Sequence, residues 1–282
     1  MRDSARRGVV PAAASALMLL LLGGVAAAPN PKPKDVELCN GADRTSPDPQ
    51  IEGCTALIES GKETPKTLAI AYNNRGNAYT GKGEYDRAIQ DYDQSIKLNP
   101  NHARAFNNRG VAYQKKGEYD RAIKDFDESI KLNPNNASAI FNRAEAYLNK
   151  GEYQRAVRDF DEAIRLKPTS DTVWNGRCWT RAIVGELQAA LADCNEALRL
   201  QPGVAATLDS RGFTYLKMGE WDSAIGDYSS ALQLDPTLAS SLYGRGLAKL
   251  KKGDITGGNA DVAAATRIDS KIVEDFVHYG VQ

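Results

Sequence analysis

Four cysteines are the side chains in this sequence best suited to react with one another. They are Cys39, Cys54, Cys178 and Cys194, and no two of them have the C-x-x-C spacing of a redox or zinc site. An even number of cysteines in an exported chain favours two disulfides. The sequence therefore predicts structural cross-links rather than thiol chemistry.

Histidine, the usual proton shuttle and metal ligand near neutral pH, occurs only at His102 and His278. These two residues lie far apart, and the sequence supplies no set of nucleophile, base and orienting group. We therefore expect no catalytic residue, no metal site and no cofactor. The alternative is an enzyme with its active site in segments 28–68 or 271–282, which are too short for a catalytic domain.

The charge of the chain is balanced, with 36 Lys and Arg residues against 36 Asp and Glu residues. No basic excess points to nucleic acid or to a membrane surface as a partner. Hydrophobic residues make up 42% of the chain and charged residues 26%, which is typical of a globular protein.

Residues 1–27 have the three-part pattern of a secretory signal peptide. Three arginines precede an apolar run from Val9 to Leu22, and small residues follow it. Cleavage after Ala27 leaves a periplasmic or secreted protein with no stable membrane insertion. The alternative is a membrane-tethered assembly factor that keeps segment 8–28 as an anchor.

A period of 34 residues runs through most of the chain. Proline follows this period from Pro100 to Pro236, and glycine follows it from Gly83 to Gly253. Each unit reads as two helices, of which the first ends at the glycine and the second ends before the proline. In the first unit these helices are expected at about 69–82 and 85–98. A helix pair this short cannot bury its apolar face alone, so neighbouring pairs must stack as a solenoid.

The repeated columns resemble the tetratricopeptide repeat, whose signature sets aromatic, Gly, Tyr, Ala, aromatic and Pro positions at fixed offsets. The first unit supplies Tyr72, Gly76, Tyr79, Ala88, Tyr92 and Pro100. The resemblance implies an all-α fold, in which antiparallel helix pairs stack as a right-handed superhelical solenoid. It also implies that the solenoid binds other proteins and that the chain is of the exported bacterial type. Six repeats are expected over 69–270, in the units 69–102, 103–136, 137–170, 171–204, 205–238 and 239–272, the last of which overlaps the closing helix.

Two flanking segments complete the array. Segment 28–68 reads as a degenerate cap repeat that carries the first cysteine pair. Segment 271–282 reads as a C-terminal capping helix, because Ile272, Phe276 and Tyr279 belong to an apolar stripe. We expect this helix to cover the last exposed face of the stack.

Two columns of opposite charge face each other across every predicted helix pair. In an antiparallel pair, residues equally far from the turn lie opposite, which pairs Arg75 with Asp91. The same pairing recurs in all six repeats, at Arg109–Asp125, Arg143–Asp159, Arg177–Asp193, Arg211–Asp227 and Arg245–Asp261. The sequence therefore predicts a ladder of interhelical salt bridges, with solvated surface charge as the alternative.

The cysteines also lie at nearly equal distances on either side of a turn. Cys178 and Cys194 flank the turn at Gly185, and Cys39 and Cys54 flank 43–47. Each pair is therefore expected to form a disulfide within its own helix pair, and a loop of about 15 residues is worth roughly 3 kcal/mol. For Cys178 and Cys194 the alternative is two packed thiols.

The resemblance places the first helix of each repeat along a concave groove that binds a protein or peptide segment, whose identity the sequence does not give. The groove columns are polar at one end and apolar at the other. The candidate peptide-binding residues are Asn73, Asn77, Asn107, Phe141, Trp179, Phe213, Leu216, Tyr243 and Leu247. For Trp179 and Phe213, packing against a neighbouring helix is an equal alternative to binding.

The best-known docking mode of the family grips a peptide carboxylate with Lys, Arg and Asn side chains. Asn77, Asn108 and Asn142 match the Asn places, but Asn73 and Ser138 stand where basic residues are needed. We therefore do not expect this mode.

Overall fold

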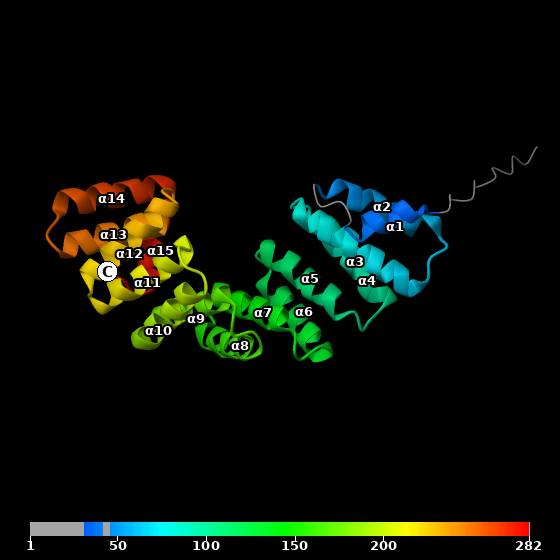
Figure 1. Ribbon diagram of the computed structural model, residues 1–282, viewed down its shortest axis with the longest axis horizontal. Coiled ribbons are helices and arrows are strands. Elements are labelled where there is room, and N and C mark those ends of the chain that lie inside the picture. The colour runs from blue at the N-terminus through cyan, green and yellow to red at the C-terminus, as the bar shows by residue number, and fades with distance from the viewer. Residues whose placement is uncertain (1–30, 42–45, 282) are drawn as a thin grey trace, which may run out of the picture.

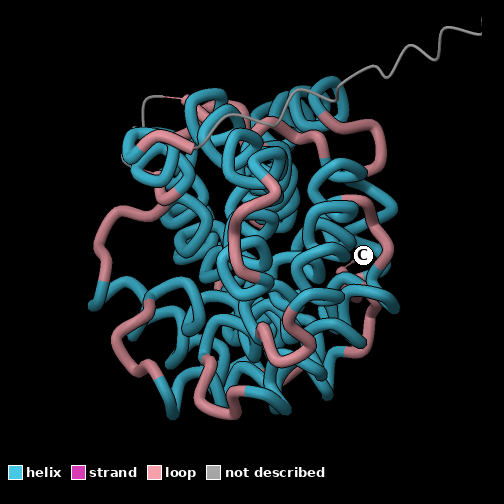
Figure 2. Tube along the Cα trace, turned by 90° about the vertical axis from the view of Figure 1, so that its right-hand side faces the viewer, coloured by secondary structure: helices cyan, strands magenta, loops and turns pink. Residues whose placement is uncertain are grey.

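A computed structural model describes residues 31–41 and 46–281 of the chain. The predicted signal peptide 1–27 lies outside the described residues. The described part contains fifteen helices and no strand, and Figures 1 and 2 show how the helices are arranged. The prediction of an all-α solenoid is confirmed. Within the same residues, no helix is both long and apolar enough to cross a membrane.

The helices follow one another in antiparallel pairs. A cap pair consists of α1 (Pro33–Cys39) and α2 (Asp48–Ser60). The six repeat pairs are α3 (Pro65–Gly81) and α4 (Tyr85–Leu98), α5 (Ala103–Lys115) and α6 (Tyr119–Leu132), α7 (Ala137–Asn149) and α8 (Tyr153–Leu166), α9 (Asp171–Val184) and α10 (Leu187–Leu200), α11 (Ala205–Met218) and α12 (Trp221–Leu234), and α13 (Ala239–Lys251) and α14 (Ile255–Ile268). A short helix, α15 (Ile272–His278), ends the chain.

The helix ends follow local sequence signals. Gly83 adopts a φ of 75° just after α3, in the left-handed region that glycine tolerates, and the same column repeats this geometry down the chain. The first helix of repeat one is longer than expected, because α3 begins at Pro65 rather than at 69. Thr64 caps it by accepting a hydrogen bond from the backbone N–H of Thr67, and proline suits the first helical position.

The stacked pairs form an arc (Figure 1). In the middle of the chain, α5, α7 and α9 lie on the inner side of the arc, and their partners α6, α8 and α10 lie on the outer side. The core of the described residues lies between the two sets of helices in three clusters of small, aliphatic and aromatic side chains: one in the cap pair, one from Tyr79 to Val173 and one from Cys178 to Phe276. Gly110, for example, lies so close to the ring of Phe126 that a Cβ atom there would fall 2.6 Å from it.

The Arg–Asp columns form the expected ladder in all six repeats. Arg109 donates from Nε and Nη2 to the two carboxylate oxygens of Asp125, at 2.8 and 2.7 Å. The other five pairs have the same two-bond geometry. Both partners are largely buried, with 19% of the Arg109 side chain and 8% of the Asp125 side chain exposed. The hydrogen bonds to Asp91 raise the pKa of Arg75, as expected for a guanidinium held by a buried carboxylate.

Each ladder arginine also reaches the preceding repeat, a contact that the sequence analysis did not predict. Arg109 Nη1 donates to Asp93 of α4 at 2.6 Å, and Arg143 Nη1 donates to Asp127 of α6 at the same distance. The acceptors in the remaining repeats are Thr55, Asp161, Asn195 and Ser229. The arginine column therefore joins the two helices of one repeat and also joins neighbouring repeats.

The signature position that holds Tyr79 in repeat one holds a basic residue in two other repeats, and both basic residues bind aspartates of the ladder. Repeat four has Arg181 where the signature has Tyr, and its Nη1 donates to Asp193 at 2.7 Å. Repeat six has Lys249 at that place, and its ammonium donates to Asp261 at 2.8 Å. Each substitution adds a second cation to a carboxylate that its ladder arginine already holds.

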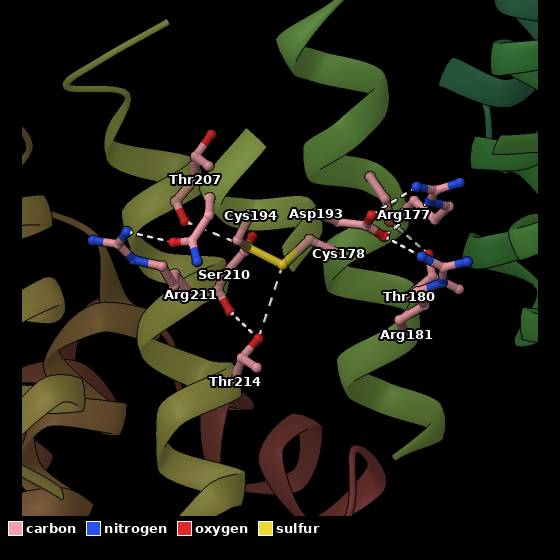
Figure 3. Close-up of a disulfide and its surroundings, with 12 residues drawn as sticks. Arg177, Cys178, Thr180, Arg181, Asp193, Cys194, Thr207, Ser210, Arg211 and Thr214 are labelled. Atoms are coloured by element: carbon pink, nitrogen blue, oxygen red, sulfur yellow. Dashed lines mark hydrogen bonds and ion pairs between the residues drawn. A yellow bond between two sulfur atoms is a disulfide. The ribbon is translucent and has the colours of Figure 1, made fainter. Parts of the chain in front are cut away.

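Cystines join the two helices of the cap pair and of repeat four. The bonds are Cys39–Cys54 between α1 and α2, and Cys178–Cys194 between α9 and α10. These are the pairings that antiparallel geometry favoured. In Figure 3 the second disulfide crosses the space between α9 and α10, where other repeats place a glycine against an aromatic ring. The cystine thus replaces a packing contact and leaves the neighbouring Arg177–Asp193 pair in place.

We expect Asp125→Ala to lower the stability of the chain by about 3 kcal/mol, because it leaves the guanidinium of Arg109 buried without its carboxylate. A double-mutant cycle with Arg109→Ala, read by chemical denaturation, should give a coupling of at least about 1 kcal/mol. Asp86→Ala is the control, since that carboxylate also meets a cation, Lys116, but is 79% exposed. Additive effects at Arg109 and Asp125 would rule out a stabilising ladder.

Candidate functional site

The concave groove is lined by the first helices of the repeats, and its character changes along the array. In α3 and α5 the inward columns carry asparagines, whereas in α9, α11 and α13 they carry Trp179, Phe213 and Tyr243. The inward columns thus define a polar half, in the first two repeats, and an aromatic half, in the last three. The two halves differ in how much of their surface is free.

In the polar half, asparagine side chains hydrogen-bond to one another between repeats. Asn108 donates to Asn73 at 3.1 Å and to Asn77 at 2.8 Å, and Asn142 donates to Asn107 at 3.0 Å. Asn73 is buried, so its amide holds repeats together, whereas Asn77 is exposed to the groove. Sequence analysis offered Asn73 as a binding residue and did not predict this network.

The aromatic half is not open to solvent, and for Phe213 the structure shows the packing alternative. Phe213, Leu216 and Tyr243 are buried, with 1%, 4% and 8% of their surface exposed. Trp179 and Leu247 are partly buried and belong to the same apolar cluster. The cover is α15, the C-terminal segment of the chain itself, which Figure 1 shows alongside α11 and α13.

Ring contacts fix α15 in the groove. Phe276 lies 5.6 Å from Phe213 and 4.8 Å from Tyr243 between ring centroids. Tyr279 lies 5.3 Å from Trp179, edge to face. The closing helix therefore packs on the last repeat but also reaches back across α11 to α9, further than a cap on the end of the stack. The contacts with α11 and α9 come in addition to the expected cover of the last repeat.

Polar contacts hold the end of the same segment. Lys217 donates to the backbone carbonyls of Tyr279 at 2.9 Å and Ile183 at 3.0 Å, and burial lowers the pKa of this ammonium. His278 shares a hydrogen bond of 3.0 Å with the hydroxyl of Tyr153, in repeat three. Together with the ring contacts, these bonds join the C-terminal segment to repeats three to six.

Phe141 stays outside the ring cluster. It is partly buried, and its ring centroid lies 6.0 Å from that of Phe160, a core residue of its own repeat. It also lines a small cavity of about 190 Å³ with Thr172 and Val173. Phe141 is therefore separate from the ring cluster that Trp179, Phe213 and Tyr243 form with α15.

A cavity of about 530 Å³ lies in the groove where α15 meets α7, α9 and α11. Its apolar wall includes Leu148, Trp179 and Phe276. Its polar wall includes four carboxylates, from Glu145, Asp209, Asp269 and Asp275, and no lysine or arginine. The larger hollow of about 740 Å³ between α2 and α4 lies outside the groove and is lined by Arg75 and Asp91, which the ladder already uses.

Burial makes two of these carboxylates hard to ionise. It raises the pKa of Asp209 to about 6, although hydrogen bonds from Ser241 and Ser240 oppose the change. It also raises the pKa of Glu145, against the attraction of Lys115. Asn175 adds a side-chain oxygen that is buried and accepts no hydrogen bond from the described residues. The cavity thus combines carboxylate acceptors with the hydroxyls of Ser210 and Ser240 and the amide of Asn175, which can donate as well as accept.

Among the described residues, no group of three His, Cys, Asp or Glu side chains is arranged to hold a metal ion.

Family models agree with the repeat columns. Models described as tetratricopeptide repeat match residues 103–136 and 126–158, and one described as TPR repeat matches 76–117 and 212–253. No curated protein matches the sequence.

Solved structures share the fold at low sequence identity. A tetratricopeptide repeat protein from Parabacteroides merdae is 19% identical over 88% of this chain and 99% of its own, with a TM-score of 0.67. YrrB, described as a TPR protein with an unusual peptide-binding site, is 22% identical over 69% of this chain and 98% of its own, with a TM-score of 0.56. The MamA protein is 23% identical over 61% and 94%, with a TM-score of 0.51.

Asp209 should make the stability of the chain depend on pH. Its folded pKa of about 6 lies above the ordinary value of 3.8, so the folded state binds the proton more tightly and loses stability as pH rises from about 4 to 7. Asp209→Asn should remove up to about 3 kcal/mol of this loss. Urea unfolding at pH 4 and pH 7 measures it, with the exposed Glu59→Gln as control. An unchanged pH dependence in Asp209→Asn would show that Asp209 does not carry the effect.

Proposed function

We propose that the chain, which belongs to the tetratricopeptide repeat family, is a non-catalytic scaffold that binds a segment of another protein in its concave groove. The observation that supports this proposal is the position of α15. A short helix with one apolar face already lies in the groove, held by aromatic rings of three repeats. A surface that accepts such a segment from its own chain has the shape and chemistry to accept one from a partner.

The groove offers a partner two kinds of contact. The open polar half presents Asn77 and Lys115, both exposed, for hydrogen bonds to the backbone or polar side chains of a bound segment. The aromatic half, which α15 covers, offers apolar anchors to a partner that displaces α15, and such anchors contribute most of the binding energy in many interfaces.

We further infer that the chain works outside the cytoplasm. The N-terminal pattern of residues 1–27 favours export, and two disulfides are stable in an oxidising compartment. Both features support a periplasmic or secreted scaffold, and retention of segment 8–28 as an anchor is the competing proposal.

The compartment is tested on protein isolated from its native host. We expect its N-terminus near residue 28 and non-reducing peptide maps that contain only the Cys39–Cys54 and Cys178–Cys194 cross-links. An intact N-terminus at Met1, or four free thiols, would count against export.

The binding face is tested by site-specific photo-crosslinking. A benzophenone amino acid is placed at Asn77 or Lys115 in the groove, and at Glu128 on the outer helix α6 as the matched control, since that side chain is 48% exposed. We expect both groove positions to give discrete adducts with one partner in native extracts and the outer position to give none. Adducts from Glu128 alone would place the interface on the convex face and contradict groove binding.

A further inference from the structure

Each interface between two successive helix pairs is a joint of the array, and an ion pair ties most joints at the same edge. A lysine just after the first helix of a repeat donates to an aspartate in the first turn of the preceding second helix. The pairs are Lys82–Asp48, Lys116–Asp86, Lys150–Asp120 and Lys252–Asp222. Because each lysine directly precedes the glycine turn of its own helix pair, these ion pairs lie at the edge where those turns are.

Two joints have uncharged side chains at the places of this ion pair. They are Val184 and Gln154 between repeats three and four, and Met218 and Gln188 between repeats four and five. The later joint has other ties, because Lys217 donates to the backbone carbonyl of Ile183 at 3.0 Å. The rings of Trp179 and Phe213 also lie 4.7 Å apart across it. In the part of the chain that the structure describes, no hydrogen bond or ring contact between repeats three and four replaces the ion pair at this edge.

The apolar core is also divided at this joint, and the boundary passes through α9. Val173, in the first turn of α9, belongs to the cluster that begins at Tyr79, whereas Cys178 belongs to the cluster of repeats four to six. Gly176 lies so close to the ring of Phe160, in repeat three, that a Cβ atom there would fall 2.7 Å from it. The first half of α9 is therefore packed on repeat three, and its second half belongs to the body that repeats four to six form.

The C-terminal segment, residues 272–281, crosses the joint at the edge where the ion pair is missing. His278 shares a hydrogen bond of 3.0 Å with the hydroxyl of Tyr153, whose neighbour in the sequence is Gln154. On the other side of the joint, Phe276 is held by aromatic rings of α11 and α13. The segment is thus fixed to one body and reaches the other at the edge that lacks an ion pair of its own.

Space remains between this segment and repeat three. The cavity of about 530 Å³ is lined by Leu148 of α7 and by Phe276 of α15, on the concave side of the joint. Because protein interiors are normally close-packed, two bodies with a cavity between them can change their separation without breaking a packed contact there. The hydrogen bond between His278 and Tyr153 is therefore a contact that limits such a movement.

We propose that the joint between repeats three and four is a hinge of the array, and that the C-terminal segment is the strap that limits its opening. The pivot is the first half of α9, where Arg177 Nη1 also donates to Asp161 at 2.6 Å. The free edge carries Gln154 and Val184. Opening of this edge changes the curvature of the arc, and with it the distance between the polar half and the aromatic half of the groove.

The free energies involved are small, and this is what a hinge requires. A single exposed ion pair contributes little to the stability of a folded chain. A hinge moves between states that differ little in free energy, so one ion pair or one hydrogen bond can shift their populations. The hinge goes beyond the proposed function, because it moves with no partner bound.

Distances across the joint measure the movement in the full chain. Spin labels are carried by a ketone amino acid, since the cysteines form disulfides, and pulsed electron paramagnetic resonance gives the distribution of distances between them. Lys124 and Ala192 are exposed and lie two repeats apart across the joint, and the matched control pair is Gln90 and Arg158, exposed at the same column one repeat earlier. We expect the distribution across the joint to be at least about twice as wide as the control distribution. Equal widths would overturn the hinge.

Restoring the ion pair should hold the free edge. Gln154→Asp with Val184→Lys places the two charges where other joints have them, and should narrow the distribution across the joint to the control width. Gln188→Asp with Met218→Lys makes the same change of charge at the next joint, and should leave the distribution unaltered. A distribution that stays wide with the restored pair, or that narrows equally with the control, would show that the joint does not open at this edge.

The strap is tested by removing its hydrogen bond. Tyr153→Phe deletes only the hydroxyl that meets His278, and should widen the distribution across the joint by about half. Tyr119→Phe, which deletes the hydroxyl at the same position of repeat two, is the control and should not. An unchanged distribution in Tyr153→Phe would overturn the strap. Circular dichroism verifies that every variant keeps its helix content, and crosslinks from Asn77 and Lys115 test groove binding separately from all of these outcomes.

Discussion

The ion pairs of the arginine column are the interaction on which the rest of the structure depends. A helix pair of this length cannot fold by itself, because its apolar face is buried only against the neighbouring pair. Each ladder arginine spans that boundary, since two of its N–H groups bind the aspartate of its own repeat and a third binds the repeat before it. The planar guanidinium suits this role because it presents donors in fixed directions. Repetition of the contact sets the spacing of every pair and so the line of the groove.

Because the ladder is uniform, the groove columns are free to vary without disturbing the stack. The first repeats use that freedom for asparagines that bind one another between helices. The later repeats use it for aromatic rings, which are costly to leave in water and therefore need a cover. The chain supplies the cover from its own C-terminus, where Phe276 and Tyr279 reach rings on three helices.

The sequence by itself determined what is periodic in this protein. Columns such as Gly83, Pro100 and the Arg75–Asp91 pair repeat every 34 residues, so local helix signals and antiparallel geometry predicted the repeats, the ladder and the pairing of the cysteines. Only the tertiary structure decided what is not periodic. Trp179, Phe213 and Tyr243 look like an open binding track in sequence, and nothing in their spacing shows that Phe276 lies over them. The reason is that α15 occurs once in the chain, and the arc brings repeats four and five, which are distant from it in sequence, against this one short segment.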